Sequence, residues 1–207
     1  MAKYIKPLCK ICRKYGVKLY LKGRRCESDK CAVDPRKSKI RLIKPKKMSE
    51  YALQLREKNK VKIYYGVMER QFKRYFEIAK KHKGVTGEVL LQLLERRLDN
   101  VIYKANFAYS RKMARQLINH RYVIVNGKRN DRPGYLVEVG DIIQIKFKNE
   151  NIIKTIKECI EEYKTRTKPL WMKVDEDNLK IEILRYPDRS EVSIPVNEQL
   201  IVNLYSK

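Results

Sequence analysis

Four cysteines lie close together near the start of the 207-residue chain, in an arrangement suited to binding a metal ion. Cys9 and Cys12 are separated by two residues, Cys26 and Cys31 by four, and thirteen residues lie between the pairs. Two close pairs joined by a short loop can supply four thiolates to one tetrahedral zinc ion. Four protein ligands would leave no open position on the metal, so we expect Zn²⁺ in a structural role.

Two other states of these thiols fit the same spacing and stay open. Disulfide bonds belong to oxidising compartments, and no apolar export signal is expected, because the residues before Cys9 lack one. An iron–sulfur cluster would usually serve electron transfer, for which nothing else in the sequence is suited. The Lys and Arg residues around the pairs favour zinc, because positive charge lowers the pKa of a thiol and so favours the metal-binding thiolate.

The net charge indicates a polyanionic partner. The chain has 49 Lys and Arg against 24 Asp and Glu, which gives +25. Residues 1–50 hold 17 basic and 4 acidic side chains (net +13), residues 51–150 hold 22 and 10 (net +12), and residues 151–207 hold 10 and 10. Self-repulsion of this size does not stabilise a fold, so a nucleic acid is the expected partner. No membrane partner is expected, because no apolar run approaches the roughly 18 residues of a membrane span.

Ser110 and the residues after it indicate a phosphate-binding helix. Serine is a favoured N-cap, yet Arg111, Lys112 and Arg115 follow it in the first helical turns. Positive charge at that end opposes the helix dipole, at a cost of about 0.3–1 kcal/mol for each charge. A bound phosphate would reverse that cost, because it would meet free backbone N–H groups and cations together. The alternative is a solvated charged helix face without a ligand.

The elements that position these residues follow from the spacing of apolar side chains. Helices are expected to begin at the caps Ser49 and Thr86, and residues 68–79 form a further amphipathic helix. The apolar run at 122–125 ends at Asn126-Gly127, a dipeptide typical of a two-residue β-hairpin turn. Helices followed by a small sheet with a basic edge suit contacts to the shape and phosphates of folded RNA.

Ordered motifs run along nearly the whole chain. In its centre they are Arg97-Leu98-Asp99-Asn100-Val101, Ser110-Arg111-x-x-Ala114-Arg115-Gln116-Leu117-Ile118, Val125-Asn126-Gly127 and Gly140-Asp141. Elsewhere they are Tyr51-Ala52-x-x-Leu55-Arg56-Glu57-Lys58, Glu69-Arg70-Gln71-Phe72, Lys83-Gly84-Val85-Thr86-Gly87 and Glu198-Gln199-Leu200-Ile201-Val202-x-x-Tyr205-Ser206. With the four cysteines, they resemble the bacterial-type family of ribosomal small-subunit protein four, in its zinc-binding, four-cysteine form.

The resemblance implies an α+β fold in three parts. Residues 1–47 would form a zinc knuckle and an extended basic linker. Residues 48–96 would form a helical domain that residues 165–207 complete. Residues 97–164 would form an inserted RNA-binding module of helices and a small sheet. Asn106 and Arg121 stand where the family often has glycine, and residues 34–47 lack the family's Pro-Gly-x-His-Gly stretch.

The resemblance also implies a function. Members of the family are cytoplasmic structural components of the small ribosomal subunit that bind the 5′ domain of small-subunit rRNA and nucleate subunit assembly. They lie beside small-subunit proteins three and five, near the channel through which mRNA enters. They are associated with translational accuracy, and some repress their own mRNA. No small-molecule substrate is expected.

Cationic, amide and aromatic side chains in three regions are the candidate RNA contacts. Near the cysteines they are Lys3, Tyr4, Arg13, Tyr20, Lys22 and Arg25. In the helical domain they are Tyr65, Arg70, Gln71 and Lys73. In the inserted module they are Arg97, Arg111, Lys112, Arg115, Gln116, Lys128 and Arg129.

Other classes of function fit the sequence less well. An RNA-modifying or tRNA-charging enzyme would need a separate catalytic domain, and none fits in the remaining residues. His82 and His120 have no sequence-evident nucleophile or paired carboxylate to work with. A zinc-bearing RNA regulator outside the ribosome would carry the same charge, so the sequence alone does not separate it from a ribosomal protein.

Overall fold

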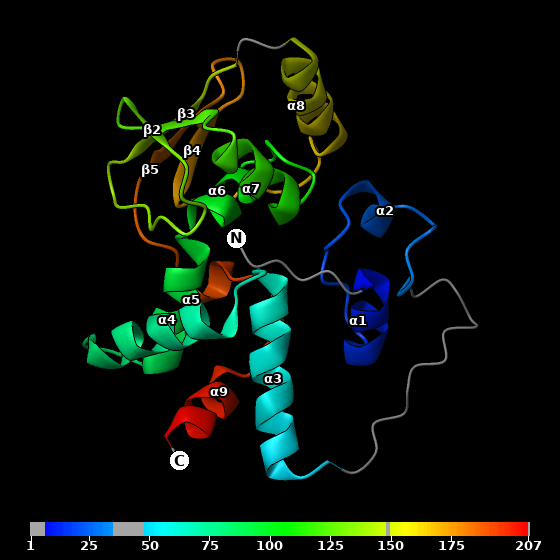
Figure 1. Cartoon of the computed structure of the whole chain (residues 1–207), viewed down its shortest axis with the longest axis vertical. Helices are drawn as coiled ribbons and strands as arrows, with labels where there is room; N and C mark the ends of the chain where they lie inside the picture. Colours follow the sequence, from blue (N-terminus) through cyan, green and yellow to red (C-terminus); the bar gives the residue numbers. More distant parts are fainter. Residues whose placement is uncertain (1–6, 35–47, 148–149, 207) are drawn as a thin grey trace. The chain divides into compact units, whose positions relative to one another are not determined.

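The computed structural model describes residues 7–34, 48–147 and 150–206 (Figure 1). The chain divides into two compact units, one of Met1–Leu90 with Ser193–Lys207 and one of Leu91–Val192. The candidate contacts Lys3 and Tyr4 and nearly all of the predicted basic linker lie outside the described residues.

The first unit is helical. Its elements are α1 (Leu8–Tyr15), α2 (Arg24–Glu27), α3 (Glu50–Tyr64), α4 (Glu69–Lys81), the start of α5 (Thr86–Glu95) and, from the other end of the chain, α9 (Glu198–Tyr205). The side chain of Ser49 caps α3 as predicted, because its hydroxyl oxygen accepts a hydrogen bond from the Ala52 N–H at 3.3 Å. The close approach of α5 to α9 requires Gly87, where a Cβ would lie 2.7 Å from the Cγ of Glu198.

The C-terminal helix α9 completes this unit. It packs against α3 and is drawn in red beside that helix in Figure 1. The ring of Tyr205 stacks on the buried face of α4, 4.5 Å from the ring of Phe76. Its hydroxyl donates to Glu69 at 3.1 Å, and Glu69 also pairs with Lys58 and Lys62 at 2.7 Å. Partial burial favours a higher pKa for Glu69, but the two lysines outweigh it and lower the pKa to about 2.

The second unit combines helices with one antiparallel sheet. Its elements are α6 (Leu98–Lys104), α7 (Arg111–Asn119), β1 (Val123–Val125), β2 (Lys128–Asn130), β3 (Ile142–Ile145), α8 (Glu150–Glu162), β4 (Met172–Asp175), β5 (Lys180–Ile183) and the 3₁₀ turn η1 (Arg189–Glu191). The strand order is β2-β1-β3-β5-β4, with every neighbouring pair antiparallel. The predicted hairpin turn is confirmed: Val125 pairs with Lys128, and Asn126 and Gly127 take φ of 49° and 78°.

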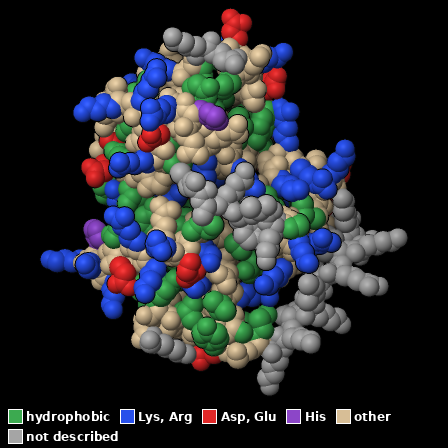
Figure 2. All heavy atoms as spheres, in the orientation of Figure 1, with side chains coloured by type: hydrophobic (Ala, Val, Ile, Leu, Met, Phe, Trp, Pro, Cys, Tyr) green, Lys and Arg blue, Asp and Glu red, His purple; other side chains and the backbone are tan. Residues whose placement is uncertain are grey.

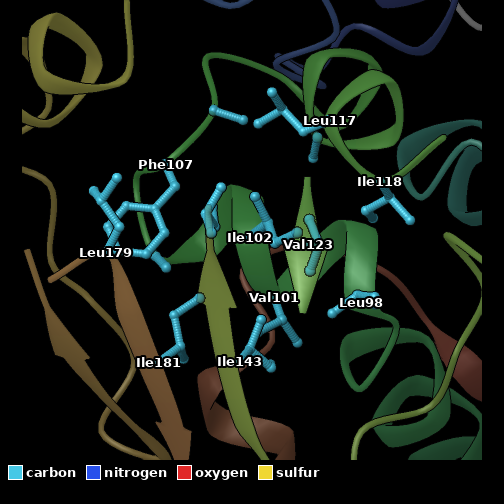
Figure 3. Packing of buried hydrophobic residues seen from close by; sticks show 14 of the residues in the cluster. Leu98, Val101, Ile102, Phe107, Leu117, Ile118, Val123, Ile143, Leu179 and Ile181 are labelled. Atoms are coloured by element: carbon cyan, nitrogen blue, oxygen red, sulfur yellow. The ribbon is translucent and has the colours of Figure 1, made fainter. Parts of the chain in front are cut away.

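The core of the second unit lies between the sheet and helices α6 and α7. Figure 3 shows side chains from these elements converging on one another. Fully buried members include Leu98, Ile102, Ile118, Ile143 and Ile181. The apolar faces of two short helices are therefore covered by the inward-facing residues of the strands, which is the usual requirement for a stable small domain.

The two units divide the C-terminal region differently from the predicted domains. Residues 165–192 were expected to complete the helical domain, but β4 and β5 lie in the second unit, and Ile181 of β5 is registered with Ile143 of β3. Only Ser193–Lys207 joins the helical unit. The alternating apolar residues of β5 are compatible with packing in either unit. Strand β5 belongs to the second unit because it pairs with β3, which lies about 40 residues earlier in the chain.

No helix among the described residues combines the length and apolar composition that a membrane span requires. The broader prediction of a helical domain and a small helix-and-sheet module is confirmed, with the sheet larger than expected because of β4 and β5.

Candidate nucleic-acid interface

The centre of the second unit is a buried carboxylate held by two arginines. Asp99, near the start of α6, is fully buried and accepts hydrogen bonds from Arg97 at 2.9 and 3.1 Å and from Nε of Arg115 at 2.6 Å. Burial favours a higher pKa for Asp99, but the two guanidinium groups outweigh it and lower the pKa below its ordinary value. The carboxylate is therefore charged, and it ties the entry to α6 to the side of α7.

Asn100 continues this network on the next residue of α6. Its side-chain amide donates to the carboxylate and the backbone carbonyl of Glu95, at 2.6 and 2.9 Å. Its Oδ1 accepts a hydrogen bond from Nε of Arg111 at 2.9 Å. The guanidinium of Arg111 also lies over the ring of Tyr103, with 4.4 Å between its Cζ and the ring centroid. Arg111 is thus directed inward although it is the first residue of α7.

The candidate contacts of this unit consequently fall into two groups. Arg97 and Arg111 are buried, and the side chain of Arg115 is only 24% exposed. They hold α6 and α7 together rather than forming an open cationic surface. The exposed candidates are Lys112, Gln116, Lys128 and Arg129. The cap at Ser110 is confirmed, with its hydroxyl oxygen accepting from the Met113 N–H at 3.3 Å.

Sequence reasoning missed Arg166, which follows α8. Its guanidinium lies 4.4 Å from the centroid of the Tyr103 ring, the same ring that Arg111 contacts. It also lies 5.7 Å from the ring of Tyr163. No local pattern in the sequence indicates this arrangement, because Tyr103 and Arg166 are more than 60 positions apart and meet only in the folded unit.

In the helical unit, Arg70 and Lys73 are exposed on α4 and Gln71 is partly buried, with its amide donating to the Tyr75 hydroxyl at 3.1 Å. Tyr65 was expected to contact RNA, but the structure places its side chain in the core. Tyr65 is fully buried and its ring packs edge-on against Tyr64, with 4.9 Å between centroids. The ring is used in the core, so it offers no surface for a partner.

Near the cysteines, the candidates Arg13, Lys22, Arg25 and Tyr20 are all exposed. Tyr20 takes a left-handed backbone conformation with φ of 50°. Arg56 of α3 ties this segment to the rest of the helical unit, because it donates to the backbone carbonyl of Lys14 at 3.0 Å.

The four cysteine thiols form no disulfides, and all but Cys9 are buried. Burial raises the pKa of Cys12 and Cys26, and repulsion from the other cysteines raises both further, while the Lys22 N–H donates to the Cys26 sulfur at 3.3 Å. The expected lowering of the pKa by nearby cations is not found for these two thiols, where only backbone N–H groups act in that direction. Residues 7–34, 48–147 and 150–206 hold no group of three or more His, Cys, Asp or Glu side chains placed to bind a metal ion, so the structure does not show the predicted zinc knuckle, and zinc at these cysteines stays a prediction.

Lys and Arg outnumber Asp and Glu among the charged side chains. Figure 2 shows Lys and Arg side chains scattered over the visible face, with fewer Asp and Glu among them. A helical unit joined to a small helix-and-sheet unit, with a net charge of +25 over the chain, is typical of the class of RNA-binding proteins. Such binding is driven by phosphate neutralisation, which exposed Lys and Arg supply.

Comparisons with known proteins identify the family. Residues 3–95 match "Ribosomal protein S4/S9 N-terminal domain" and residues 96–143 match "S4 domain". The chain is 51% identical to "Small ribosomal subunit protein uS4A" of Symbiobacterium thermophilum, 52% to "Small ribosomal subunit protein uS4" of Thermodesulfovibrio yellowstonii and 47% to the protein of that name from Thermus thermophilus. Each alignment covers 100% of both chains. The chain belongs to the ribosomal protein uS4 family.

The buried Asp99 network gives a stability prediction. Asp99→Asn should lower the free energy of unfolding by about 3–5 kcal/mol, because it leaves the buried charge of Arg97 without its counter-charge. Asp131→Asn, which removes the exposed partner of Arg121, should cost less than about 1 kcal/mol. Denaturant unfolding of the three proteins measures the difference.

The same network fixes a pH dependence. Because folding lowers the pKa of Asp99, its contribution to stability is fully present above the unfolded pKa of 3.8 and is lost as pH falls through the folded pKa. Wild type should therefore lose more stability in acid than Asp99→Asn. Equal losses in the two proteins would show that the carboxylate is not held charged.

Proposed function

We infer that this chain is a structural component of the small ribosomal subunit that binds ribosomal RNA, and not an enzyme. The observation that carries this conclusion is the full-length relationship to proteins named small ribosomal subunit protein uS4, at about half identity. The family also implies its location, in small subunits of cytoplasmic ribosomes. The excess positive charge supplies the physical basis for RNA binding.

We propose more specifically that the RNA target is the 5′ domain of small-subunit rRNA and that binding there nucleates assembly. The supporting features are the exposed cations of both units, among them Arg70, Lys73, Lys112, Lys128 and Arg129. The buried arginines around Asp99 act indirectly, by holding α6 and α7 in place. Such a rigid surface loses little conformational entropy on binding, which favours affinity.

The family resemblance extends the proposal to the surroundings in the subunit. Small-subunit proteins three and five are the proposed neighbours, and mRNA would pass nearby as it enters the ribosome. Effects on translational accuracy and repression of the chain's own mRNA are part of the same proposal. They rest on the family resemblance and on the general affinity of a basic surface for folded RNA.

We also propose that one zinc ion joins Cys9, Cys12, Cys26 and Cys31. The chemistry of the four thiols supports this proposal. None of them is in a disulfide, and the other three cysteines all raise the pKa of Cys12 by charge repulsion. A backbone N–H, that of Lys22, already donates to the Cys26 sulfur. Bound zinc would supply structural cross-linking between α1 and α2, by replacing the repulsion among thiolates with attraction to the cation.

The ribosomal assignment predicts the behaviour of the native protein. In a sucrose gradient of lysate, the chain should comigrate with small subunits at near-stoichiometric amounts and stay there in moderate salt. A peak at the top of the gradient, with little in the small-subunit fractions, would instead support an RNA regulator outside the ribosome.

The proposed phosphate contacts predict a salt dependence. Replacing Lys112, Lys128 and Arg129 together by Gln should weaken binding to a 5′-domain transcript. The slope of log K against log salt should fall by about 0.7–0.9 for each phosphate that is no longer neutralised. These residues are exposed, so the fold should be unchanged.

The matched control replaces Lys154, Lys157 and Lys164 by Gln. These lysines are also exposed in the second unit, but they lie in the electroneutral part of the chain. The control should change the slope much less. Equal reductions for both triple variants would mean that binding depends only on total charge.

Zinc removal should act locally. Native protein should contain about one zinc per chain, and a chelator should accelerate proteolysis within residues 1–33 before the rest of the chain. Cys26→Ser should lose the metal, whereas Cys159→Ala, at a buried cysteine of α8, should keep it. Metal-free native protein whose proteolysis is unchanged by chelator would overturn the zinc proposal.

A further inference from the structure

Three aromatic rings form a partly exposed stack where α7 ends and the sheet begins. The rings of His120 and Tyr122 are stacked, with 5.9 Å between centroids and 29° between planes. The ring of Phe147, which follows β3, lies 4.9 Å from that of Tyr122 at an angle of 52°. None of these rings is among the candidate RNA contacts named from the sequence above.

The stack has an inner end and an outer end. Tyr122 and Phe147 are partly buried and pack against the core of the second unit. His120, at the C-cap of α7, is exposed. Tyr122 is the only ring that stacks on His120 in the described part of the chain. His120 is thus an exposed imidazole that is stacked on a single ring, which is the arrangement that a further planar group could extend.

The backbone between His120 and Tyr122 fixes their arrangement. The Arg121 N–H donates to the Ile118 carbonyl at 2.8 Å and the Tyr122 N–H donates to the Leu117 carbonyl at 3.1 Å. These two bonds are those of a Schellman motif, with Arg121 in the left-handed position at φ of 60°. The tight reversal brings residues on either side of Arg121 together.

Arginine at that position is unfavourable compared with glycine, and it puts a basic residue between His120 and Tyr122 in the sequence. The side chain of Arg121 is 67% exposed, and its guanidinium is ion-paired with the exposed carboxylate of Asp131 at 3.2 Å, a pair that a phosphate would compete with. Lys146, also exposed, lies across the strands from Tyr122, because its N–H donates to the Tyr122 carbonyl at 2.9 Å. Two basic residues therefore adjoin Tyr122, Arg121 in the sequence and Lys146 across the strands. Aromatic rings with basic residues nearby are complementary to a nucleotide, which combines a planar base with phosphates.

We propose that His120, Tyr122 and Phe147 form a stacking site for one unpaired base of ribosomal RNA, with Arg121 and Lys146 near the adjoining phosphates. The proposal rests on the proposed function, because it requires the second unit to face RNA. It adds a contact of a different physical kind, since stacking on a base releases no counterions whereas phosphate contacts do. The nearby basic residues favour RNA over an apolar protein segment.

The test is binding of the full chain to a small-subunit rRNA transcript across a range of salt concentrations. His120→Ala should weaken binding about 5-fold or more, with the salt slope unchanged. Tyr122→Ala should weaken it further and Tyr122→Phe should restore it, because phenylalanine keeps the ring. His82→Ala is the matched control, since His82 is also an exposed histidine that caps a helix, α4, and it should bind like wild type.

A second readout separates stacking from a purely structural role. Ultraviolet cross-linking of the assembled small subunit should join RNA to His120 or Tyr122. If wild type binds the transcript while His120→Ala and Tyr122→Ala bind equally well, the stacking site is wrong and the proposed function stands. If wild type does not bind the transcript, both fail. Cross-links from these residues only to another protein would also overturn the stacking site.

Discussion

The ion cluster at Asp99 is the constraint on which the second unit depends. A carboxylate without access to water must find counter-charges inside the protein, and Arg97 and Arg115 provide them at hydrogen-bonding distance. These bonds join the start of α6 to the middle of α7. The two helices, held together in this way, pack their apolar residues against those of β1 and β3.

The same constraint divides the basic residues by role. A guanidinium that is committed to a buried carboxylate or to an internal ring, as in Arg97 and Arg111, contributes little to the field outside. Exposed cations such as Lys128 on the hairpin keep their charge available to a polyanion. The strength of RNA binding therefore depends on the exposed cations, whereas the geometry of the surface depends on the buried arginines. Counting Lys and Arg in a sequence does not distinguish the two sets.

The sequence could predict the features that depend on residues close together in the chain. The caps at Ser49 and Ser110 and the turn at Asn126-Gly127 depend on residues within three positions of one another, and all are found in the structure. The destination of β5 and the burial of Tyr65 depend on distant partners, so sequence patterns did not reveal them. The candidate interface also separates local from distant features. The basic start of α7 was predicted from adjacent residues. The pairing of Arg115 with Asp99 and the contact of Arg166 with the Tyr103 ring join distant residues and were not predicted.

The neutral C-terminal quarter of the chain has a structural explanation. Strand β5 lies between β3 and β4, where like charges on neighbouring strands would repel at about 5 Å. Its register instead places Lys180 opposite Asp175 and Glu182 opposite Lys173. In the helical unit, α9 brings Tyr205 to Glu69, whose charge two lysines already balance. Segments that complete a core must pair their charges within the protein, so the excess that binds RNA is carried by the remaining three quarters of the chain.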